Sequence, residues 1–353
     1  MSNEFRELLR KVGSGTHTGK NLSRAEAAAA ARMMLLQEAT PAQIGAFLIS
    51  HRIKRPTGEE LAGMLDTYDK FGPTLQPITS PRPVIVLSSP YDGRSRTAPL
   101  SPLTALILGA AGCPVVMHGG ERMPTKEGVP LIDIWRGLGV DWTSLSLEQV
   151  QQVLETIGLG FVYLPNHFPL AQGLVPYREQ IGKRPPLATL ELIWSPYRGD
   201  CRIVAGFVHP PTENMMREAF ALRGTPYLIT VKGLEGSCDL PLERTAIIGL
   251  TYPSEHGSEF ERLLLAPRSY GFVGKDIPLE TTEQLVENML SVLEGKPSNL
   301  MPAALWNGGF YLWQCGICSD FQSGISKAKV ILSEGRALQK LETLRAVGYI
   351  KSV

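Results

Sequence analysis

The sequence lacks an excess of charge of either sign. Its 353 residues carry 35 Lys and Arg against 34 Asp and Glu, for a formal net charge of +1. Such a chain exerts no general attraction on a polyanion, so binding of nucleic acid would need a local basic patch. Apolar residues make up 43 % and charged residues 20 %, a composition that is typical of folded globular proteins and excludes a disordered one.

Cysteines are few and match no metal or disulfide framework. The five are scattered, and the opening residues show no secretory signal pattern, so we expect reduced thiols and a cytoplasmic location. Cys315 and Cys318 form the one CxxC, but no second Cys/His pair stands at zinc-like spacing. Buried structural thiols are therefore favoured over a metal or redox site.

Hydrophobic runs long enough to span a bilayer are also missing. Residues 97–120 contain no Asp, Glu, Lys or Arg, but Pro99, Pro102 and Pro114 divide them. The remaining helix has only about ten residues, too few to cross a membrane. We therefore predict a buried core helix there and no membrane association.

Helix start signals are abundant in the N-terminal part. Ser23, Thr40 and Thr57 are each followed three residues later by Glu or Gln, the capping-box pattern. Together with an opening amphipathic stretch, these signals predict helices near 24–38, 41–52 and 58–70. The Pro- and Gly-rich residues 71–83 that follow indicate a linker.

Beyond the linker, β-rich runs alternate with helical ones. Strands are predicted at 84–88, 114–118, 160–164, 202–208, 226–231 and 245–250, and later helices near 282–294, 301–314 and 322–344. This alternation predicts an α/β fold with a mainly parallel central sheet. A small all-helical N-terminal domain at 1–75 and a larger α/β domain at 80–353 are expected.

Two apparent motifs fail on inspection. Residues 13–21, GSGTHTGKN, lack the glycine and the Ser or Thr of a P-loop, and no strand precedes them. Residues 24–52 look like a helix-turn-helix, with His51, Arg52, Lys54 and Arg55 near the end of the second helix. Cations at a helix C-terminus suit its dipole in any case, so the pattern alone does not indicate nucleic-acid binding.

The loop 88–102, SSPYDGRSRTAPLSP, joins a predicted strand to the buried helix. That arrangement can hold phosphate, because loop N–H groups and the helix N-terminus both face an anion. Here the loop has a single glycine, and it adds Arg94 and Arg96, whose forked guanidinium groups bind phosphate. A phosphate site retuned from its usual form is favoured over a mere connection.

The sequence around this loop resembles the anthranilate phosphoribosyltransferase family. Ser89-Pro-Tyr-Asp-Gly93 stands at the family's G-T-G-G-D, Met117-His-Gly-Gly-Glu121 at K-H-G-N-R, and Asp133-Ile-Trp-Arg-Gly-Leu-Gly-Val140 at D-V-L-E-A-L-G-V. Similar segments at 38–54, 175–185 and 303–313 extend the resemblance over nearly the whole chain. It implies the family's fold, a helical domain completed by a segment near 165–190, and a homodimer.

The resemblance implies a glycosyltransferase that moves ribose 5-phosphate from phosphoribosyl pyrophosphate to an aromatic, acidic acceptor, as in tryptophan biosynthesis. It places His118 near the acceptor as a catalytic residue, Arg178 on the acceptor's acidic group, and Mg²⁺ between Glu235 and Asp239. The donor phosphates would be bound by Ser89, Tyr91, Asp92, Gly93, Arg94, Arg96, Ser101 and Gly119.

Several departures weaken this comparison. Pro90 removes an N–H donor from the loop, Met117 replaces the motif lysine, and residues 122–130 form a loop two residues longer than the family's. Cys238 stands where the magnesium motif G-x-D-G-x-D-E has a carboxylate, which predicts a weakened site. These departures do not favour anthranilate itself as the acceptor.

A non-catalytic protein of the same fold that binds nucleic acid is the alternative. The arginines and the lysine of the loop and of the later segments would then line one groove and contact a phosphate backbone. These residues are Arg94, Arg96, Arg178, Lys183, Arg184, Arg198 and Arg202.

Overall fold

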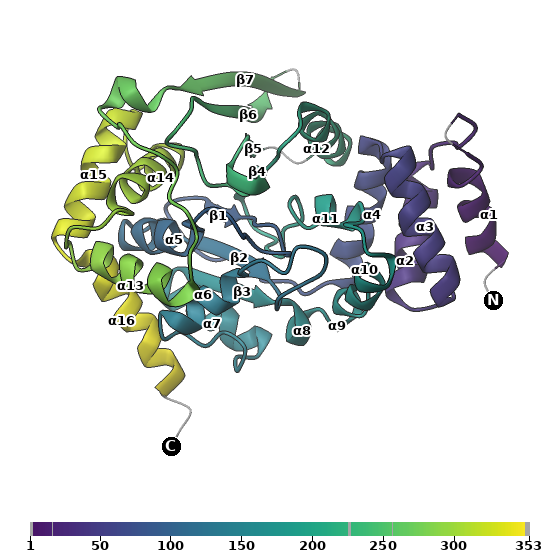
Figure 1. The fold of residues 1–353 in the computed structure, drawn as a ribbon, viewed down its shortest axis with the longest axis horizontal. Helices are drawn as coiled ribbons and strands as arrows, with labels where there is room; N and C mark the ends of the chain where they lie inside the picture. The colour runs from purple at the N-terminus through teal and green to yellow at the C-terminus, as the bar shows by residue number, and fades with distance from the viewer. Residues whose placement is uncertain (1–2, 16, 225–226, 256, 350–353) are drawn as a thin grey trace.

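The structure is a computed structural model that describes residues 3–15, 17–224, 227–255 and 257–349. Four helices at the N-terminus pack into a bundle at one end of the molecule (Figure 1). They are α1 (Asn3–Val12), α2 (Arg24–Leu35), α3 (Pro41–Lys54) and α4 (Gly58–Phe71). The three predicted capping boxes all form, at Ser23, Thr40 and Thr57, and fix where α2 to α4 begin.

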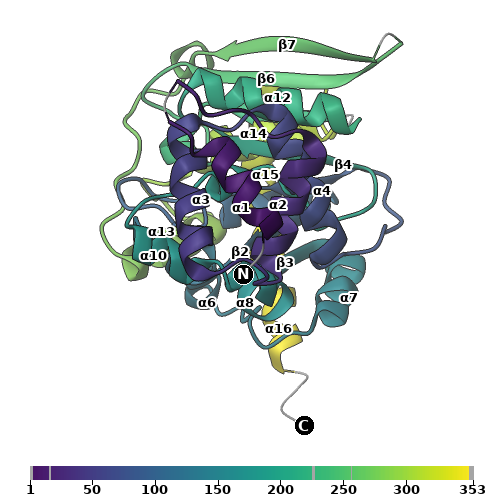
Figure 2. The ribbon, with the colours of Figure 1, turned by 90° about the vertical axis from the view of Figure 1, so that its right-hand side faces the viewer.

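A seven-stranded sheet forms the centre of the rest of the chain, in the order β3-β2-β1-β4-β5-β6-β7. The strands are β1 (Val84–Leu87), β2 (Val115–Gly119), β3 (Leu159–Tyr163), β4 (Cys201–Gly206), β5 (Leu228–Val231), β6 (Ala246–Ser254) and β7 (Gly257–Leu265). The first five are parallel, which confirms the expected α/β fold. The long β6–β7 hairpin is antiparallel and lies along one edge of the molecule (Figure 2); β7 was not predicted.

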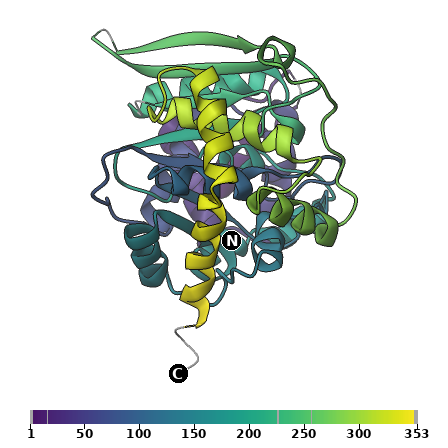
Figure 3. The same cartoon turned by 90° about the vertical axis from the view of Figure 1, so that its left-hand side faces the viewer.

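Helices cover both faces of the sheet. They include α5 (Ser101–Ala110), α6 (Leu131–Gly137), α7 (Leu147–Ile157), α12 (Pro210–Arg223), α13 (Thr282–Leu293), α14 (Met301–Gln314), α15 (Phe321–Ser333) and α16 (Arg336–Tyr349). Helix α5 is buried along nearly its whole length, as its uncharged sequence predicts. The single helix predicted at 322–344 is wrong: Gly335, with φ of +68°, separates α15 from α16. Helix α16 runs along the side opposite the bundle (Figure 3).

Four short helices lead from β3 back toward the bundle: α8 (Leu164–His167), α9 (Pro169–Gln172), α10 (Val175–Ile181) and α11 (Leu187–Leu190). The hydroxyl of Tyr177 donates to Gln37 of the bundle at 2.6 Å, and α10 and α11 contact α3 and α4. This segment corresponds to the one expected to complete the helical domain; the exact domain boundaries stay a prediction. None of the helices described is long and apolar enough to cross a membrane.

Glu60 anchors the start of α4 inside the bundle. Its fully buried carboxylate accepts hydrogen bonds from the N–H groups of Leu22 and Thr57, both at 2.8 Å, and from Lys54 at 2.9 Å. His51 lies 3.2 Å away. Burial alone would raise the pKa of Glu60, but these partners outweigh it and lower the pKa to about 2.

We expect Glu60→Gln to reduce the free energy of unfolding by about 3 kcal/mol at neutral pH, because the ionised carboxylate is stabilised more in the folded state than in the unfolded one. The folded pKa lies below the ordinary 4.5, so this contribution is complete above pH 4.5 and lost as the pH falls toward 2. Urea unfolding between these limits measures it, with exposed Glu4→Gln as control. If the free energies of unfolding of wild type and Glu60→Gln differ by the same amount across that range, the lowered pKa of Glu60 is not the source of the stability.

Candidate functional site

The predicted site residues gather at the carboxyl edge of the sheet. Strand β1 has β2 on one side and β4 on the other, so the strand order reverses there. Open α/β sheets bind ligands at such a switch point, outside the carboxyl ends of their strands. The loop after β1 carries Ser89 to Arg96, and the end of β2 carries His118 and Gly119. The turn after β5, including the short helix η1 (Leu234–Gly236), carries Glu235 and Asp239.

The loop after β1 is held by the longer loop 122–130. Arg94 and Val129 exchange two backbone hydrogen bonds, at 3.1 and 2.7 Å. Gly93 has φ of +74°, and a Cβ there would lie 2.4 Å from the carbonyl carbon of Gly128. Only glycine allows this approach, so Gly93 serves the packing of two loops on each other.

Arg94 is not free to bind phosphate in this arrangement. Its side chain is 1 % exposed and its guanidinium is paired with the carboxylate of Asp239, which is equally buried. Ser237 accepts a further hydrogen bond at 3.1 Å, and Thr97 accepts another. Arg96, by contrast, is 79 % exposed, with its Nε 3.7 Å from Glu235. The two loop arginines, expected to act alike, therefore have different environments.

Glu235 is enclosed by donors. Its carboxylate accepts from the backbone N–H groups of Arg96 at 3.0 Å and Thr97 at 2.9 Å, and it pairs with Lys126 at 2.5 Å. Burial alone would raise the pKa of Glu235, but Lys126 and these N–H groups hold it well below its usual range. Lys126 belongs to the longer loop 122–130. The sequence analysis noted the length of that loop but did not predict Lys126 as a site residue.

These residues do not fit a magnesium ion. Mg²⁺ needs free oxygen lone pairs in near-octahedral geometry, whereas Glu235 and Asp239 already accept from cations and N–H groups. Burial also raises the pKa of Cys238 to about 12, so its thiol stays protonated and is no ligand for a hard cation. Within the described residues, no group of three or more His, Cys, Asp or Glu is placed to hold a metal.

His118 is enclosed by the aromatic rings of Tyr91 and Trp194. Its ring is fully buried, 5.2 Å from the ring of Trp194. The hydroxyl of Tyr91 and the Nδ1 of His118 share a hydrogen bond of 2.5 Å, so two predicted site residues bond to each other. Burial lowers the pKa of His118 to about 4, which leaves the imidazole neutral at physiological pH. No surface of His118 is open to a ligand in this conformation.

Arg178 also faces a partner within the chain. It is 3 % exposed and paired with the buried carboxylate of Glu191. Burial lowers the pKa of Arg178 to about 10. The small cavity beside this pair, which Tyr68 and Tyr91 also line, has a volume of about 10 Å³. That is the room of one water molecule and far too little for an aromatic acid.

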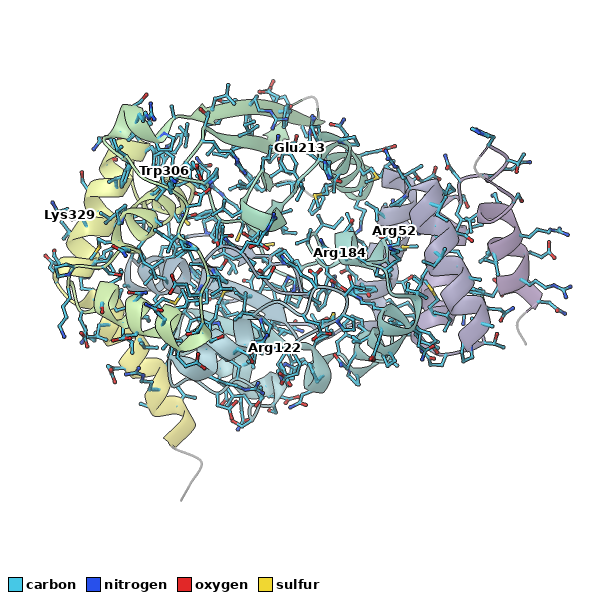
Figure 4. The ribbon with its side chains drawn as sticks, viewed as in Figure 1. Arg52, Arg122, Arg184, Glu213, Trp306 and Lys329 are labelled. Atoms are coloured by element: carbon cyan, nitrogen blue, oxygen red, sulfur yellow. The ribbon has the colours of Figure 1, made fainter. Side chains whose placement is uncertain are left out.

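An open groove lies next to these closed contacts, with a volume of about 810 Å³. Four segments line it: the end of α3, the segment that contains α11, the turn between β4 and α12 with the start of α12, and Gly236 of η1. Arg52, Arg55, Arg184 and His209 line it, and none of its described lining residues is acidic. Arg52 and Arg184 meet where the bundle faces the sheet domain (Figure 4), and Arg52 donates to the Arg184 carbonyl.

The other predicted site residues are buried or contact other residues of the chain. Ser101 begins α5 and donates to Asp239 at 3.2 Å, while Asp92 lies 3.6 Å from Arg184 at the groove. Ser89 and Gly119 are buried. Sequence reasoning missed Lys126 and Glu191, because nothing in a single sequence indicates which distant charge each will face. It also set aside Arg52 and Arg55 as an ordinary helix end.

The basic groove proposed for nucleic acid does not form from the seven residues expected to line it. Arg94 and Arg178 are buried in ion pairs, Arg198 pairs with Asp69 at 3.0 Å, and Arg202 lies over the ring of Tyr227. Of the seven, only Arg184 is among the described residues that line the groove.

Comparison with known proteins explains this architecture. Residues 6–72 match the helical bundle domain of the glycosyl transferase family, and residues 92–338 match its a/b domain. The chain belongs to this family. Anthranilate phosphoribosyltransferase of Chromobacterium violaceum, a curated relative, is 29 % identical over 332 residues, which cover 93 % of this chain and 94 % of the relative.

Solved structures with the glycosyl transferase fold agree. Anthranilate phosphoribosyltransferase from Saccharomyces cerevisiae, in complex with PRPP and Mg, superposes with a TM-score of 0.82 at 16 % identity, covering 99 % of each chain. The Thermus thermophilus enzyme has a TM-score of 0.77 at 21 % identity, covering 98 % of this chain and 99 % of its own. The resemblance and the two-part fold are therefore confirmed, while the homodimer and the cytoplasmic location stay predictions.

We expect Arg178→Met to reduce the free energy of unfolding by about 3–5 kcal/mol, because it leaves the Glu191 carboxylate buried without its cation. The double variant Arg178→Met/Glu191→Leu removes both charges and is expected to recover most of that loss. Guanidinium unfolding of the three proteins checks this. A double variant as unstable as the single one would show that packing, and not charge pairing, governs the position.

Proposed function

We propose that this chain binds a phosphorylated ligand of the phosphoribosyl pyrophosphate type in the groove between the bundle and the sheet, and transfers its phosphoribosyl group to an acceptor there. The observation that carries the proposal is the groove itself: about 810 Å³, lined by three arginines, and placed beside the carboxyl edge of the sheet. The curated relatives named anthranilate phosphoribosyltransferase support the class of reaction.

The arginines suit a polyphosphate. Each guanidinium can donate two parallel hydrogen bonds to phosphate oxygens, and such charge-assisted bonds are the stronger ones in proteins. Arg52 and Arg55 come from the end of α3, and Arg184, whose carbonyl accepts a hydrogen bond from Arg52, comes from the adjoining segment before α11. A ligand with several phosphates would contact more than one of these arginines, which restricts where its sugar can lie.

The remaining walls suit the reacting sugar and an acceptor. Apolar side chains, among them Ile53, Leu192, Phe207 and Met215, line the groove between the charged residues. In the transfer, the acceptor's lone pair forms the bond to C1 while the C1–O bond breaks and its electron pair leaves on pyrophosphate, and the proton that the amine nitrogen releases passes to pyrophosphate or to water. Apolar walls limit the access of water to the positive charge that builds on the sugar. An aromatic amine would pack on the same walls.

We expect calorimetry to detect phosphoribosyl pyrophosphate binding, and Arg55→Ala/Arg184→Ala to weaken it by about tenfold or more, since hydrogen bonds to charged groups contribute about 1.5–3 kcal/mol each. Lys329→Ala removes a charge from α15 at the far end of the molecule (Figure 4) and serves as control. No binding at millimolar ligand, or equal loss in the control, would overturn the groove assignment.

Turnover is tested separately, by pyrophosphate release with anthranilate and with a panel of other aromatic amines. Release that requires an amine and is lost in Arg55→Ala/Arg184→Ala is expected. If the chain binds phosphoribosyl pyrophosphate but releases pyrophosphate with none of the amines, the proposed ligand stands and the proposed transfer does not. Binding of single-stranded DNA that falls steeply with salt would instead favour the nucleic-acid alternative.

A further inference from the structure

Glu235 and Asp239 lie in one buried cluster with two cations of the same chain. The guanidinium of Arg94 lies between the two carboxylates: it pairs with Asp239, and its Nε is 3.8 Å from Glu235. The ammonium group of Lys126 reaches Glu235 from the other loop, at 2.5 Å. Two negative charges thus face these two cations, with the exposed Arg96 3.7 Å from Glu235 as a third, and the cluster needs no ion from solvent to balance its carboxylates.

Each oxygen of the two carboxylates has at least one donor. In Asp239, Oδ2 accepts from Arg94 and from the N–H of Leu100 at 2.9 Å, and Oδ1 accepts from Ser101 at 3.2 Å. In Glu235, Oε1 accepts from Arg96 and Thr97, and Oε2 faces Lys126. A metal ion could enter only by displacing these donors.

The backbone is shaped to make this cluster. Glu235 has φ of 54°, a left-handed conformation that costs a residue with a side chain about 1–2 kcal/mol. Its neighbour Gly236 has φ of 80° and lines the groove. Lys126 reaches the cluster from the longer loop 122–130 and also donates to the Gly93 carbonyl at 3.0 Å. Two separate features, the left-handed backbone at Glu235 and a lysine from loop 122–130, thus meet at one pair of carboxylates.

We propose that Arg94 and Lys126 form a resident cation that takes the place of a divalent metal ion between Glu235 and Asp239. The chain then neither binds Mg²⁺ at this position nor needs it to keep the two loops together. Where the proposed function also holds, ligand binding in the groove is independent of Mg²⁺. The inference itself concerns the metal alone and does not rest on the groove.

Removal of the resident cation tests this proposal. Arg94→Ala/Lys126→Ala removes the two cations that contact the carboxylates inside the cluster and leaves the exposed Arg96, 3.7 Å from Glu235, as a solvent-screened counter-charge. We expect its melting temperature to drop and to rise again by several degrees when millimolar Mg²⁺ or Mn²⁺ is added, whereas the wild-type melting temperature stays constant. Arg122→Ala is the matched control: it removes a cation from the same loop, but one that pairs with Asp133, and it should gain no response to metal.

A second measurement works even where the double variant does not fold. Electron paramagnetic resonance of Mn²⁺ with the wild-type chain is expected to show free ion only, and Lys126→Met alone should begin to retain Mn²⁺. Retention of Mn²⁺ by the wild type that is lost in Asp239→Asn would overturn the proposal. So would a folded double variant that metal does not stabilise. Neither readout uses a phosphorylated ligand, so failure here and failure of the proposed function are distinguishable.

Discussion

The ion pair between Arg94 and Asp239 determines how the centre of the molecule is arranged. It joins the loop after β1 to the turn after β5, and Asp239 also accepts the Leu100 N–H at the start of α5. A buried pair of this kind gains little net stability over an apolar contact of similar size, because both charges lose their water. Loss of one partner, however, leaves a bare charge inside the protein. The pair therefore specifies one arrangement of loops more than it strengthens the fold.

Arg178 and Glu191 form a second buried ion pair of this kind. There too a buried arginine is matched by a carboxylate of the chain, beside a cavity of about 10 Å³. Charges that would otherwise need a ligand or a metal ion are thus satisfied internally at two neighbouring places. The groove instead presents Arg52 and Arg55, which have no carboxylate partner among the described residues, beside Arg184, which lies 3.6 Å from Asp92.

Local sequence signals predicted the fold well, and the site only in part. Capping boxes placed α2 to α4 because the bonds that define them span three residues. Strand β7 escaped prediction because its pairing with β6, not its own composition, makes it a strand. In the site, Arg94 and Asp239 were both selected as functional, yet their contact joins positions 145 apart. No periodicity or motif in one sequence encodes which cation will meet which carboxylate.

The groove lies between the two domains, so binding of the proposed ligand would depend on how the domains face each other. Arg52 and Arg55 belong to the bundle, whereas His209 and Gly236 belong to the sheet domain. A ligand that contacts both walls stabilises the arrangement in which they face each other, in proportion to its affinity. Gly236 directly follows Glu235 and lines the groove, so the balanced charge cluster also supports one groove wall. A cluster that is complete without metal would hold that wall in place before the proposed ligand arrives, which would reduce the ordering cost of its binding.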